Sequence, residues 1–316
     1  MKLLVTRPLP EPVLERLRGA HEVVLRGEDR PMSEAEAAAA LAAYDAILPT
    51  LGDDFAAGAF AAAGEIRTRL LANFGVGYNH IDVAAARARG VAVTNTPGVL
   101  TDATADIAMT LLLASARRAG EGERLLRCGG WTGFHPTAFL GTEVSGKTLG
   151  IVGMGRIGQA VAARCHAGFG MEVVYFNRSE KRLPFEARRA DTLEELGGRV
   201  DFVVVAVPGG AATHHLIGAG FFRAMRPGGI FINIARGDVV DEAALVAALQ
   251  QGEIAAAGLD VYEFEPEVSP PLLAMENVVL LPHLGSATWE TRVAMGQMAA
   301  ENILAFFAGR PLLTPV

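Results

Sequence analysis

The chain has 316 residues, of which 51% are hydrophobic and 20% are charged, and its formal net charge is −7 at neutral pH. At about 100–200 residues per domain, this length predicts two globular domains. The acidic balance disfavours a nucleic-acid partner, which needs a basic face, and no apolar run approaches the roughly 18 residues of a membrane span. The two cysteines, Cys128 and Cys165, lack metal-ligand or redox spacing, so we expect a reducing, cytoplasmic compartment.

In the first third of the chain, short β-rich runs alternate with helical stretches, which is typical of an α/β fold with parallel strands. The expected strands are Lys2–Thr6, Glu22–Leu25, Ala46–Leu48, Leu70–Ala72 and Ala92–Thr94. One helix between them is Ser33–Ala43, in which Ser33 can cap the first turn and Glu36 follows three residues later. This part is predicted to be a small doubly wound unit.

The middle of the chain begins with a nearly continuous apolar stretch at Asp102–Arg118, which predicts a helix buried on most sides. The segment Gly120–Gly146 then combines glycines and aromatic residues with weak periodicity. A loop of that length inside a compact protein is usually functional. We therefore expect residues 120–146, called the arm below, to pack on the partner subunit of a homodimer.

A second α/β series follows the arm. Its expected strands are Thr148–Val152, Glu172–Phe176, Phe202–Val207, Ile230–Asn233, Ala257–Asp260 and Val278–Leu281. The last helix, Glu290–Phe307, has no strand after it, so we expect it to return and cover the first domain. The predicted architecture is two doubly wound parallel-sheet domains: residues 1–98 and 288–316 form one discontinuous domain, and residues 99–287 form the other.

The strand at the start of this second series runs directly into the pattern G-x-G-x-x-G, and a helix follows. Gly153 permits the tight turn, Gly155 lets the backbone approach a pyrophosphate, and Gly158 lets the helix pack on the strand. The N-terminus of that helix adds unpaired N–H groups that favour an anion. Because strand, turn, helix and next strand occur in this order, we interpret the turn as a dinucleotide-binding site.

The end of the next strand indicates which dinucleotide is bound. An NAD enzyme usually carries Asp or Glu about 20 residues after the glycines, where it bonds the ribose hydroxyls. Here Asn177, Arg178 and Ser179 stand at that place, nineteen residues and more after Gly158. A guanidinium and a hydroxyl suit a 2′-phosphate, which a carboxylate would repel. We predict a preference for NADP(H), with NAD(H) possible; the alternative is a solvated basic loop that tolerates both.

Three further stretches each follow an apolar strand and should lie at the carboxyl edge of the sheet, where open α/β folds hold ligands. They are Asn233–Glu242, Gly258–Pro266 and Leu281–Thr288. With these motifs, the chain resembles the D-isomer-specific 2-hydroxyacid dehydrogenase family over essentially its whole length. Within that family it is similar to glyoxylate/hydroxypyruvate reductases, through Gly129–Phe134 and Asn177–Ser179. The resemblance implies a Rossmann-type cofactor domain and a smaller flavodoxin-like substrate domain.

The resemblance also implies roles for three residues. Arg236 would bind the carbonyl and carboxylate of the substrate, His283 would donate the proton, and Glu265 would pair with His283. Chemistry supports these roles, because reduction of a 2-oxo acid needs a hydride and a proton on the carbonyl oxygen. Histidine can deliver that proton near neutral pH, and a guanidinium suits a planar 2-oxo carboxylate. The alternative for Arg236 is a surface ion pair with Asp238 or Asp241.

Two further acids and two histidines near these motifs are also candidate site residues. Glu263 and Glu267 are rivals of Glu265, but the proline that follows Glu265 matches the family motif and favours it. The neighbours His214 and His215 lack a third metal-ligand partner in the sequence, and we interpret them as surface residues.

Further site residues come from the resemblance or from position. The backbone amides of Val76 and Gly77 would hold the substrate carboxylate, and Leu51 would line the pocket. Phe134 stands where a reductase of this group carries a second tryptophan that reaches the partner's active site. The remaining expected cofactor contacts are Thr104, Arg156, Ile157, Val207, Pro208, Thr213, Ile234, Ala235, Asp260, His283 and Gly285.

The expected activity is therefore NADPH-preferring reduction of small 2-oxo acids, glyoxylate to glycolate and hydroxypyruvate to D-glycerate. One alternative is a dehydrogenase for another 2-hydroxy acid or for phosphite. An alternative from another class is a dinucleotide-sensing binding protein, similar to the transcriptional corepressors that share this fold.

Overall fold

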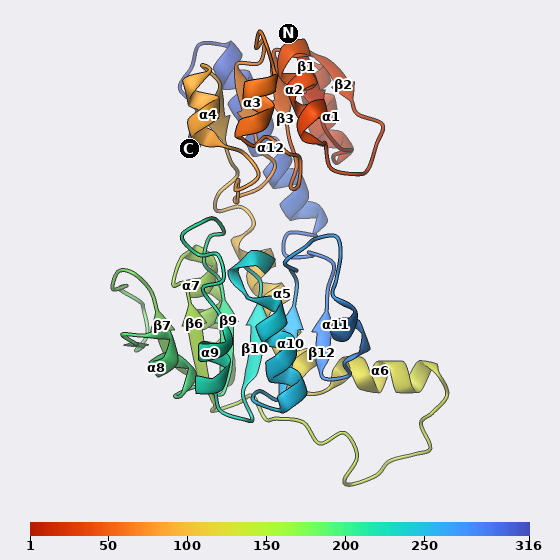
Figure 1. Cartoon of the computed structure of the whole chain (residues 1–316), viewed down its shortest axis with the longest axis vertical. Coiled ribbons are helices and arrows are strands. Elements are labelled where there is room, and N and C mark those ends of the chain that lie inside the picture. Colours follow the sequence, from red (N-terminus) through yellow and green to blue (C-terminus); the bar gives the residue numbers. More distant parts are fainter. The chain divides into compact units, whose positions relative to one another are not determined.

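A computed structural model describes all 316 residues, which form two compact units (Figure 1). Unit 1 comprises Met1–Leu100 together with Ser286–Val316, and unit 2 comprises Thr101–Gly285. Each unit contains one parallel β-sheet flanked by helices, which confirms the predicted fold class of two parallel-sheet α/β domains. No helix combines the length and the apolar composition that crossing a membrane requires.

The five-stranded sheet of unit 1 has the order β2-β1-β3-β4-β5, and all neighbouring strands are parallel. Its strands are β1 (Lys2–Val5), β2 (Glu22–Leu25), β3 (Ala46–Leu48), β4 (Leu70–Ala72) and β5 (Ala92–Thr94). Its helices are α1 (Glu11–Arg18), α2 (Glu34–Ala43), α3 (Ala57–Ala62), α4 (Val83–Ala88) and α12 (Trp289–Phe307). The capping box expected at the start of α2 is present, with Ser33 and Glu36 each bonding the other's backbone N–H.

Helix α12 follows the last residues of unit 2 in the sequence and packs against α1 and β4 of unit 1. Helices α12 and α1 approach closely at Gly296, where a Cβ atom would lie only 2.5 Å from a methyl group of Val13. The buried face of α12 includes Met295, Ala299 and Ile303. An apolar stripe at helical spacing therefore explains why the end of the chain belongs to unit 1.

Unit 2 contains a seven-stranded parallel sheet with the order β12-β11-β10-β9-β6-β7-β8. Its strands are β6 (Thr148–Val152), β7 (Glu172–Phe176), β8 (Arg188–Arg189), β9 (Phe202–Val205), β10 (Ile230–Asn233), β11 (Ala256–Leu259) and β12 (Val278–Leu280). Its helices are α5 (Thr101–Ala116), α6 (Ala119–Arg127), α7 (Arg156–Phe169), α8 (Leu193–Gly197), α9 (Ala219–Ala224), α10 (Glu242–Gln251) and α11 (Pro270–Ala274), with a 3₁₀ turn at Gly237–Val239.

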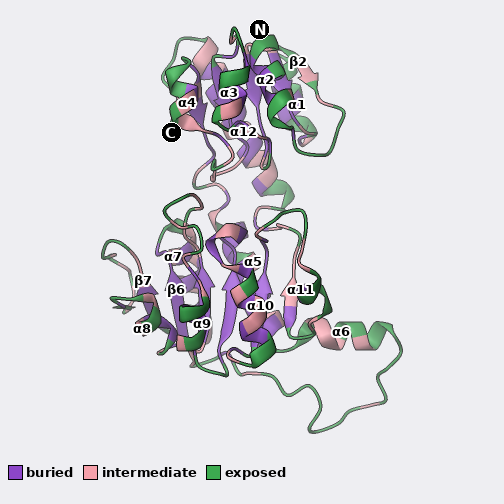
Figure 2. Ribbon diagram, viewed as in Figure 1, coloured by how far each residue is buried: buried purple, intermediate pink, exposed green.

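The order of the strands in unit 2 determines where a ligand can bind. The chain leaves β6 towards β7 on one side and continues to β9 on the other side. The central strands are buried on both faces (Figure 2). In an open parallel sheet, ligands bind outside the carboxyl ends of the strands at such a switch point. The carboxyl edge near β6 and β9 is therefore the expected place for a cofactor.

Two parts of unit 2 differ from the sequence prediction. The short edge strand β8 was not expected, because its two arginines are exposed and carry no apolar pattern. The arm was expected to be a loop, but its first part forms α6, which buries none of its residues. Glycines at the start of α6 concealed its periodicity, since glycine is a poor helix former. Residues 128–141 of the arm contain no helix or strand.

Candidate active site

The three residues predicted to carry the chemistry lie on the loops that follow three adjacent strands of unit 2. Arg236 follows β10, Glu265 follows β11 and His283 follows β12, and these strands are neighbours in the sheet. Residues that are far apart in the sequence thus come to the same carboxyl edge because the strands are parallel.

The His283 imidazole and the Glu265 carboxylate form a direct pair. The distance from His283 Nδ1 to Glu265 Oε2 is 2.9 Å, and each side chain is 30% exposed. The second carboxylate oxygen accepts the Tyr262 N–H at 3.0 Å, which fixes the orientation of Glu265. The other ring nitrogen of His283, Nε2, makes no hydrogen bond within the chain. A carboxylate on Nδ1 therefore orients the ring while Nε2 remains available to a substrate.

The surroundings keep Glu265 ionised. Burial on its own raises the pKa of this carboxyl, but the hydrogen bond and charge of His283, the Tyr262 N–H and the charge of Arg236 lower it more. The net pKa of Glu265 lies below its ordinary value. A negative charge is thus held next to the imidazole at neutral pH.

Asp260, at the end of β11, fixes the backbone that carries His283. Its carboxylate accepts the N–H groups of Leu284 at 2.6 Å and Gly285 at 2.8 Å, and its carbonyl accepts the His283 N–H at 3.0 Å. These bonds hold His283 at φ +51°, a left-handed conformation that is uncommon for residues other than glycine. Burial raises the pKa of Asp260, and the two N–H groups and His283 oppose that effect. The structure thus shows Asp260 as a cap at the strand end; its contact with the cofactor remains a prediction.

Arg236 lies beside this pair on a sharply turned segment. Burial lowers the pKa of its guanidinium, and the nearby carboxylates of Glu265 and Asp238 act in the opposite direction. Its Nη1 donates to the Ala235 carbonyl at 2.7 Å. Asp241, considered above as a surface partner of Arg236, caps helix α10 by accepting the Ala244 N–H.

Two residues that shape the Arg236 segment were missed by the sequence reasoning. The buried amide of Asn233 donates to the Arg236 carbonyl at 3.0 Å and accepts the Ala235 N–H at 3.0 Å. A Cβ atom at Gly237 would lie 1.8 Å from the carbonyl group of Tyr262, so the backbone segments that carry Arg236 and Glu265 cross in direct contact. Gly237 stood inside a quoted motif, but close contact with a segment 25 residues later leaves no signal in a single sequence.

The glycine-rich turn has the geometry of a phosphate site. Gly153 has φ +96°, and a Cβ atom there would lie 2.8 Å from the Val207 nitrogen. A Cβ atom at Gly158 would lie 2.2 Å from the Gly153 carbonyl oxygen, so this glycine lets α7 pack on the turn. Gly155 instead faces open space, with no atom within 4 Å of a Cβ position, and it caps α7 without any side-chain hydrogen bond. The first N–H groups of α7 are thus left for an anion.

The residues after β7 lie beside this turn. Asn177 accepts the Met154 N–H at 3.2 Å and donates to the Ser179 carbonyl at 2.7 Å, so its amide joins the turn to the end of β7. Arg178 and Ser179 are exposed. The Arg178 guanidinium takes part in no ion pair. The three residues that directly follow β7, Asn177 to Ser179, include no carboxylate, and the first acid after the strand is Glu180.

The other predicted cofactor contacts of unit 2 mostly line the same edge. Thr213 closes the loop after β9 by donating to the Pro208 carbonyl at 2.6 Å. Thr104 lies beside Gly285, because its side chain is 3.4 Å from the position of a Cβ atom there. Arg156 and Ile157 form the first turn of α7, and Ile234 and Ala235 are buried between β10 and Arg236.

In unit 1, the predicted carboxylate-binding loop follows β4. The Asn73 amide donates to the Gly75 and Gly77 carbonyls at 3.1 and 2.9 Å, and the Asn95 amide donates to the Val76 carbonyl at 2.8 Å. The N–H groups of Val76 and Gly77 donate to no other group of the chain. Asn73 and Asn95, which were missed, thus fix the carbonyls of this loop and leave two N–H donors exposed to an anion.

Leu51 and Phe134 were also predicted to contact the substrate. Leu51 follows β3 in unit 1, and its carbonyl accepts Nη1 of Arg7 at 2.9 Å. Phe134 is 87% exposed. The segment of the arm after α6 runs along the end of unit 2 opposite the carboxyl ends of its strands (Figure 1). The structure of one chain therefore does not bring Phe134 to the predicted catalytic residues.

The chain is similar to known proteins over nearly its whole length. The family model described as the NAD-binding domain of D-isomer specific 2-hydroxyacid dehydrogenases matches residues 109–285. The glyoxylate reductase of Thermococcus gammatolerans is 45% identical over 314 residues, which cover 98% of this chain and 93% of the relative.

Solved structures that are similar to this chain over its whole length include the following two. A protein from Thermus thermophilus is 44% identical, with a TM-score of 0.91 and full coverage of both chains. The NADPH-dependent glyoxylate/hydroxypyruvate reductase of Sinorhizobium meliloti, solved with NADP and malonate, is 40% identical with a TM-score of 0.88, over 100% of this chain and 96% of that chain. The chain therefore belongs to the D-isomer specific 2-hydroxyacid dehydrogenase family and is an NAD(P)-dependent oxidoreductase.

Proposed function

We propose that this enzyme reduces glyoxylate to glycolate and hydroxypyruvate to D-glycerate, with a preference for NADPH. The observation that carries the proposal is the His283–Glu265 pair beside Arg236, at the ends of three neighbouring strands. The relatives named glyoxylate reductase and glyoxylate/hydroxypyruvate reductase, at 40–45% identity, support this substrate class.

The residues present fit a nicotinamide dinucleotide. Gly155 leaves open space at the N-terminus of α7, whose N–H groups have no side-chain cap and can bind a pyrophosphate. Bound there, the cofactor would supply the hydride. Arg178 and Ser179, exposed at the end of β7, would hold the 2′-phosphate of NADP, because a guanidinium pairs well with phosphate. The S. meliloti reductase, crystallised with NADP, supports this preference.

The substrate would be held by charge and by backbone donors. The Arg236 guanidinium would bind the carbonyl and carboxylate oxygens of the 2-oxo acid and stabilise negative charge as it develops on the carbonyl oxygen. The N–H groups of Val76 and Gly77 would bind the carboxylate, and Leu51 would contact the apolar part of the substrate.

His283 would complete the reaction as proton donor. In reduction, the carbonyl carbon gains a hydride and the carbonyl oxygen gains a proton, which gives the 2-hydroxy acid. The Nε2 nitrogen, which has no partner in the chain, would deliver that proton while Glu265 holds Nδ1 and stabilises the imidazolium. The imidazole then regains a proton from solvent.

We propose that the enzyme is a homodimer in a reducing, cytoplasmic compartment. The arm carries several exposed apolar side chains, among them Leu126, Trp131 and Leu140, which a partner subunit would cover. Phe134 would act on the partner's active site rather than on its own. Both cysteines are free, which fits a reducing compartment.

Steady-state rates for glyoxylate, hydroxypyruvate, pyruvate and phosphite, each with NADPH and with NADH, test the proposal. The expected result is the highest kcat/KM for glyoxylate or hydroxypyruvate with NADPH. Faster turnover of phosphite or of a bulkier 2-oxo acid would overturn the substrate assignment. Equal kcat/KM values with NADH and NADPH would overturn the cofactor preference.

A further inference from the structure

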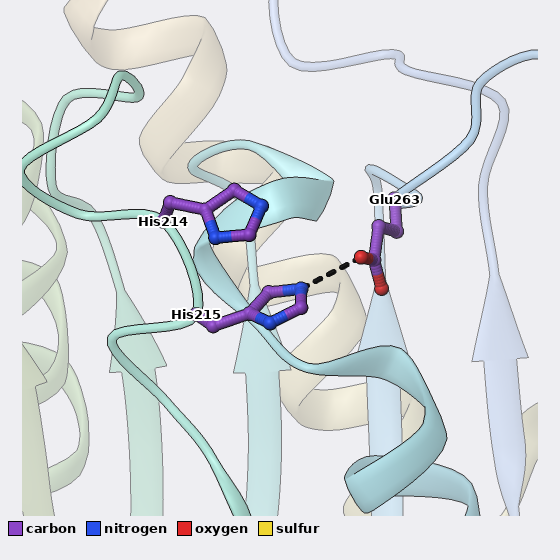
Figure 3. A group of neighbouring side chains, drawn as sticks. All are labelled: His214, His215 and Glu263. Atoms are coloured by element: carbon purple, nitrogen blue, oxygen red, sulfur yellow. Dashed lines mark hydrogen bonds and ion pairs between the residues drawn. The ribbon is translucent and has the colours of Figure 1, made fainter.

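A cluster of metal-ligating side chains lies close to the candidate active site but takes no part in the proposed mechanism. His214 and His215 stand on the loop after β9, and Glu263 stands on the loop after β11 (Figure 3). The sequence reasoning found no third partner for the two histidines, whereas the fold places Glu263 beside them; both histidines are exposed, as expected. Glu263 is 48 residues from His215 in the sequence, and only the fold brings them together.

The three side chains present their donor atoms to one small region. One ligand atom from each residue can be chosen so that all three lie within 4.8 Å of one another. The two imidazole rings stack, with centroids 4.0 Å apart and an interplanar angle of 26°. Neighbouring residues normally point in different directions, but His215 has φ +48°, and both rings lie on the same side of the chain (Figure 3).

The donor atoms of all three side chains can reach a metal ion. The His214 imidazole makes no hydrogen bond, and the hydrogen bond between His215 and Glu263 contains a proton that the ion can displace. His215 Nε2 is 2.7 Å from Glu263 Oε1, so these two atoms share a proton that a metal ion would replace. Glu263 Oε2 accepts the Glu242 N–H at 3.1 Å, which holds the carboxylate in place and leaves Oε1 directed at the histidines.

The donor set indicates the kind of ion. Two imidazoles and one carboxylate suit Zn²⁺, Co²⁺ or Ni²⁺, whereas Mg²⁺ and Ca²⁺ prefer oxygen ligands. Zinc–ligand distances of about 2.0–2.2 Å in a tetrahedral site place the donors roughly 3.3–3.6 Å apart. Because the lone pair of an imidazole nitrogen lies in the ring plane, the two rings must rotate out of their stack to converge on one ion. Both histidines are exposed, so water can occupy the fourth position.

We propose that His214, His215 and Glu263 form a binding site for a divalent transition-metal ion. The bound ion links the loop after β9 to the segment that carries Glu265, two residues beyond Glu263. Unlike the hydride-transfer residues, this site requires neither substrate nor dinucleotide, so it can be tested on the resting enzyme.

The test is titration of the tag-free, chelator-treated full chain with Co²⁺, followed by calorimetry and by visible absorption. We expect one equivalent of Co²⁺ per chain and much weaker binding of Mg²⁺. His214→Ala should weaken Co²⁺ binding at least about tenfold, because one of three protein ligands is lost. Glu263→Gln should also weaken binding, because the amide carries no charge. His135→Ala, which removes an exposed imidazole of the arm, is the matched control and should bind as the unaltered protein does.

Thermal unfolding in the presence of Zn²⁺ tests the proposal independently, in case a variant folds less well than the unaltered protein. Zn²⁺ should raise the thermal unfolding midpoint of the unaltered protein and of His135→Ala, because a ligand that binds only the folded state stabilises it. It should not raise the midpoint of His214→Ala, whose circular dichroism should be unchanged. Absence of Co²⁺ binding to the unaltered protein, or equal binding by His214→Ala, would overturn the proposal.

Discussion

The two ends of the carboxyl edge in unit 2 are built differently. At the ends of β10, β11 and β12, the polar side chains bond one another or the backbone, and Gly237 lies in direct contact with the Tyr262 carbonyl. At the ends of β6 and β7, Gly155 faces open space and Arg178 is exposed without an ion pair.

The two ends meet two different requirements: fixed side chains for the reaction and unused donors for the cofactor. Groups that transfer a proton and bind a small acid need fixed positions before the substrate arrives, because misplacement costs rate. Groups that bind a large dinucleotide need unused donors that only the ligand completes. The same substitution, glycine to alanine, should therefore lower stability at the first end and lower cofactor affinity at the second.

The largest effect is expected from Gly237→Ala. A methyl group there would lie 1.8 Å from the Tyr262 carbonyl, so the segments that carry Arg236 and Glu265 must move apart. We expect a loss of stability of about 2–4 kcal/mol and a loss of most turnover. Thermal unfolding and steady-state rates measure both effects.

Gly155→Ala is the matched substitution at the open end. Its methyl group meets no atom within 4 Å, so stability should stay within about 0.5 kcal/mol of the unaltered protein. Affinity for NADPH, followed by fluorescence titration, should fall at least about tenfold, because the methyl group fills the approach to the pyrophosphate. If Gly155→Ala unfolded more easily than Gly237→Ala, the difference between the two ends would be refuted.

Arg178→Asp should change the choice of cofactor. A carboxylate repels a 2′-phosphate but bonds ribose hydroxyls, so kcat/KM with NADPH should fall about 100-fold or more relative to that with NADH. Arg182→Asp, an exposed arginine four residues later, controls for the general loss of positive charge. Parallel changes with both cofactors would remove Arg178 from the phosphate site.

A smaller effect concerns the pH dependence of stability. The folded-state pKa of Glu265 is below its ordinary value of 4.5, so its ionised form stabilises the fold above that pH. The stabilisation is lost as the pH falls through the folded-state pKa. Glu265→Gln should therefore be less stable than the unaltered protein near pH 6, and the difference should shrink below about pH 4.5. A difference that grows towards acid pH would contradict the assigned direction of the pKa shift.

The smallest effect concerns the core beneath the open end. Cys165 on α7 is buried beside Met109, and burial raises the pKa of its thiol to about 12. The thiol should therefore stay protonated at pH 8 and resist iodoacetamide until the protein unfolds. Mass spectrometry of the folded and unfolded chain can measure this. Rapid modification in the folded state would contradict the burial of the Cys165 thiol beneath α7.

Much of this arrangement could be predicted because it depends on local patterns. Alternating apolar strands and helices indicated the two parallel sheets, and the spacing of Gly153, Gly155 and Gly158 indicated the turn before α7. The meeting of Glu265 and His283 was also expected, since both follow strands of one parallel sheet and match one family motif.

The features that could not be predicted depend on contacts between distant segments. Gly237 is needed because of Tyr262, and Glu263 reaches His215 only when two loops fold onto the same edge. Helix α6 was missed for another reason: Gly120 and Gly122 in its first turns lower the helix propensity of the segment.

The most direct measurement is a comparison of His283→Ala with the unaltered enzyme in NADPH binding and in glyoxylate reduction. We predict nearly unchanged NADPH affinity and a fall in kcat of roughly 10²–10⁴-fold, because we propose that Nε2 of His283 donates the proton. Turnover within a few-fold of the unaltered enzyme would contradict the assignment of His283 as the acid.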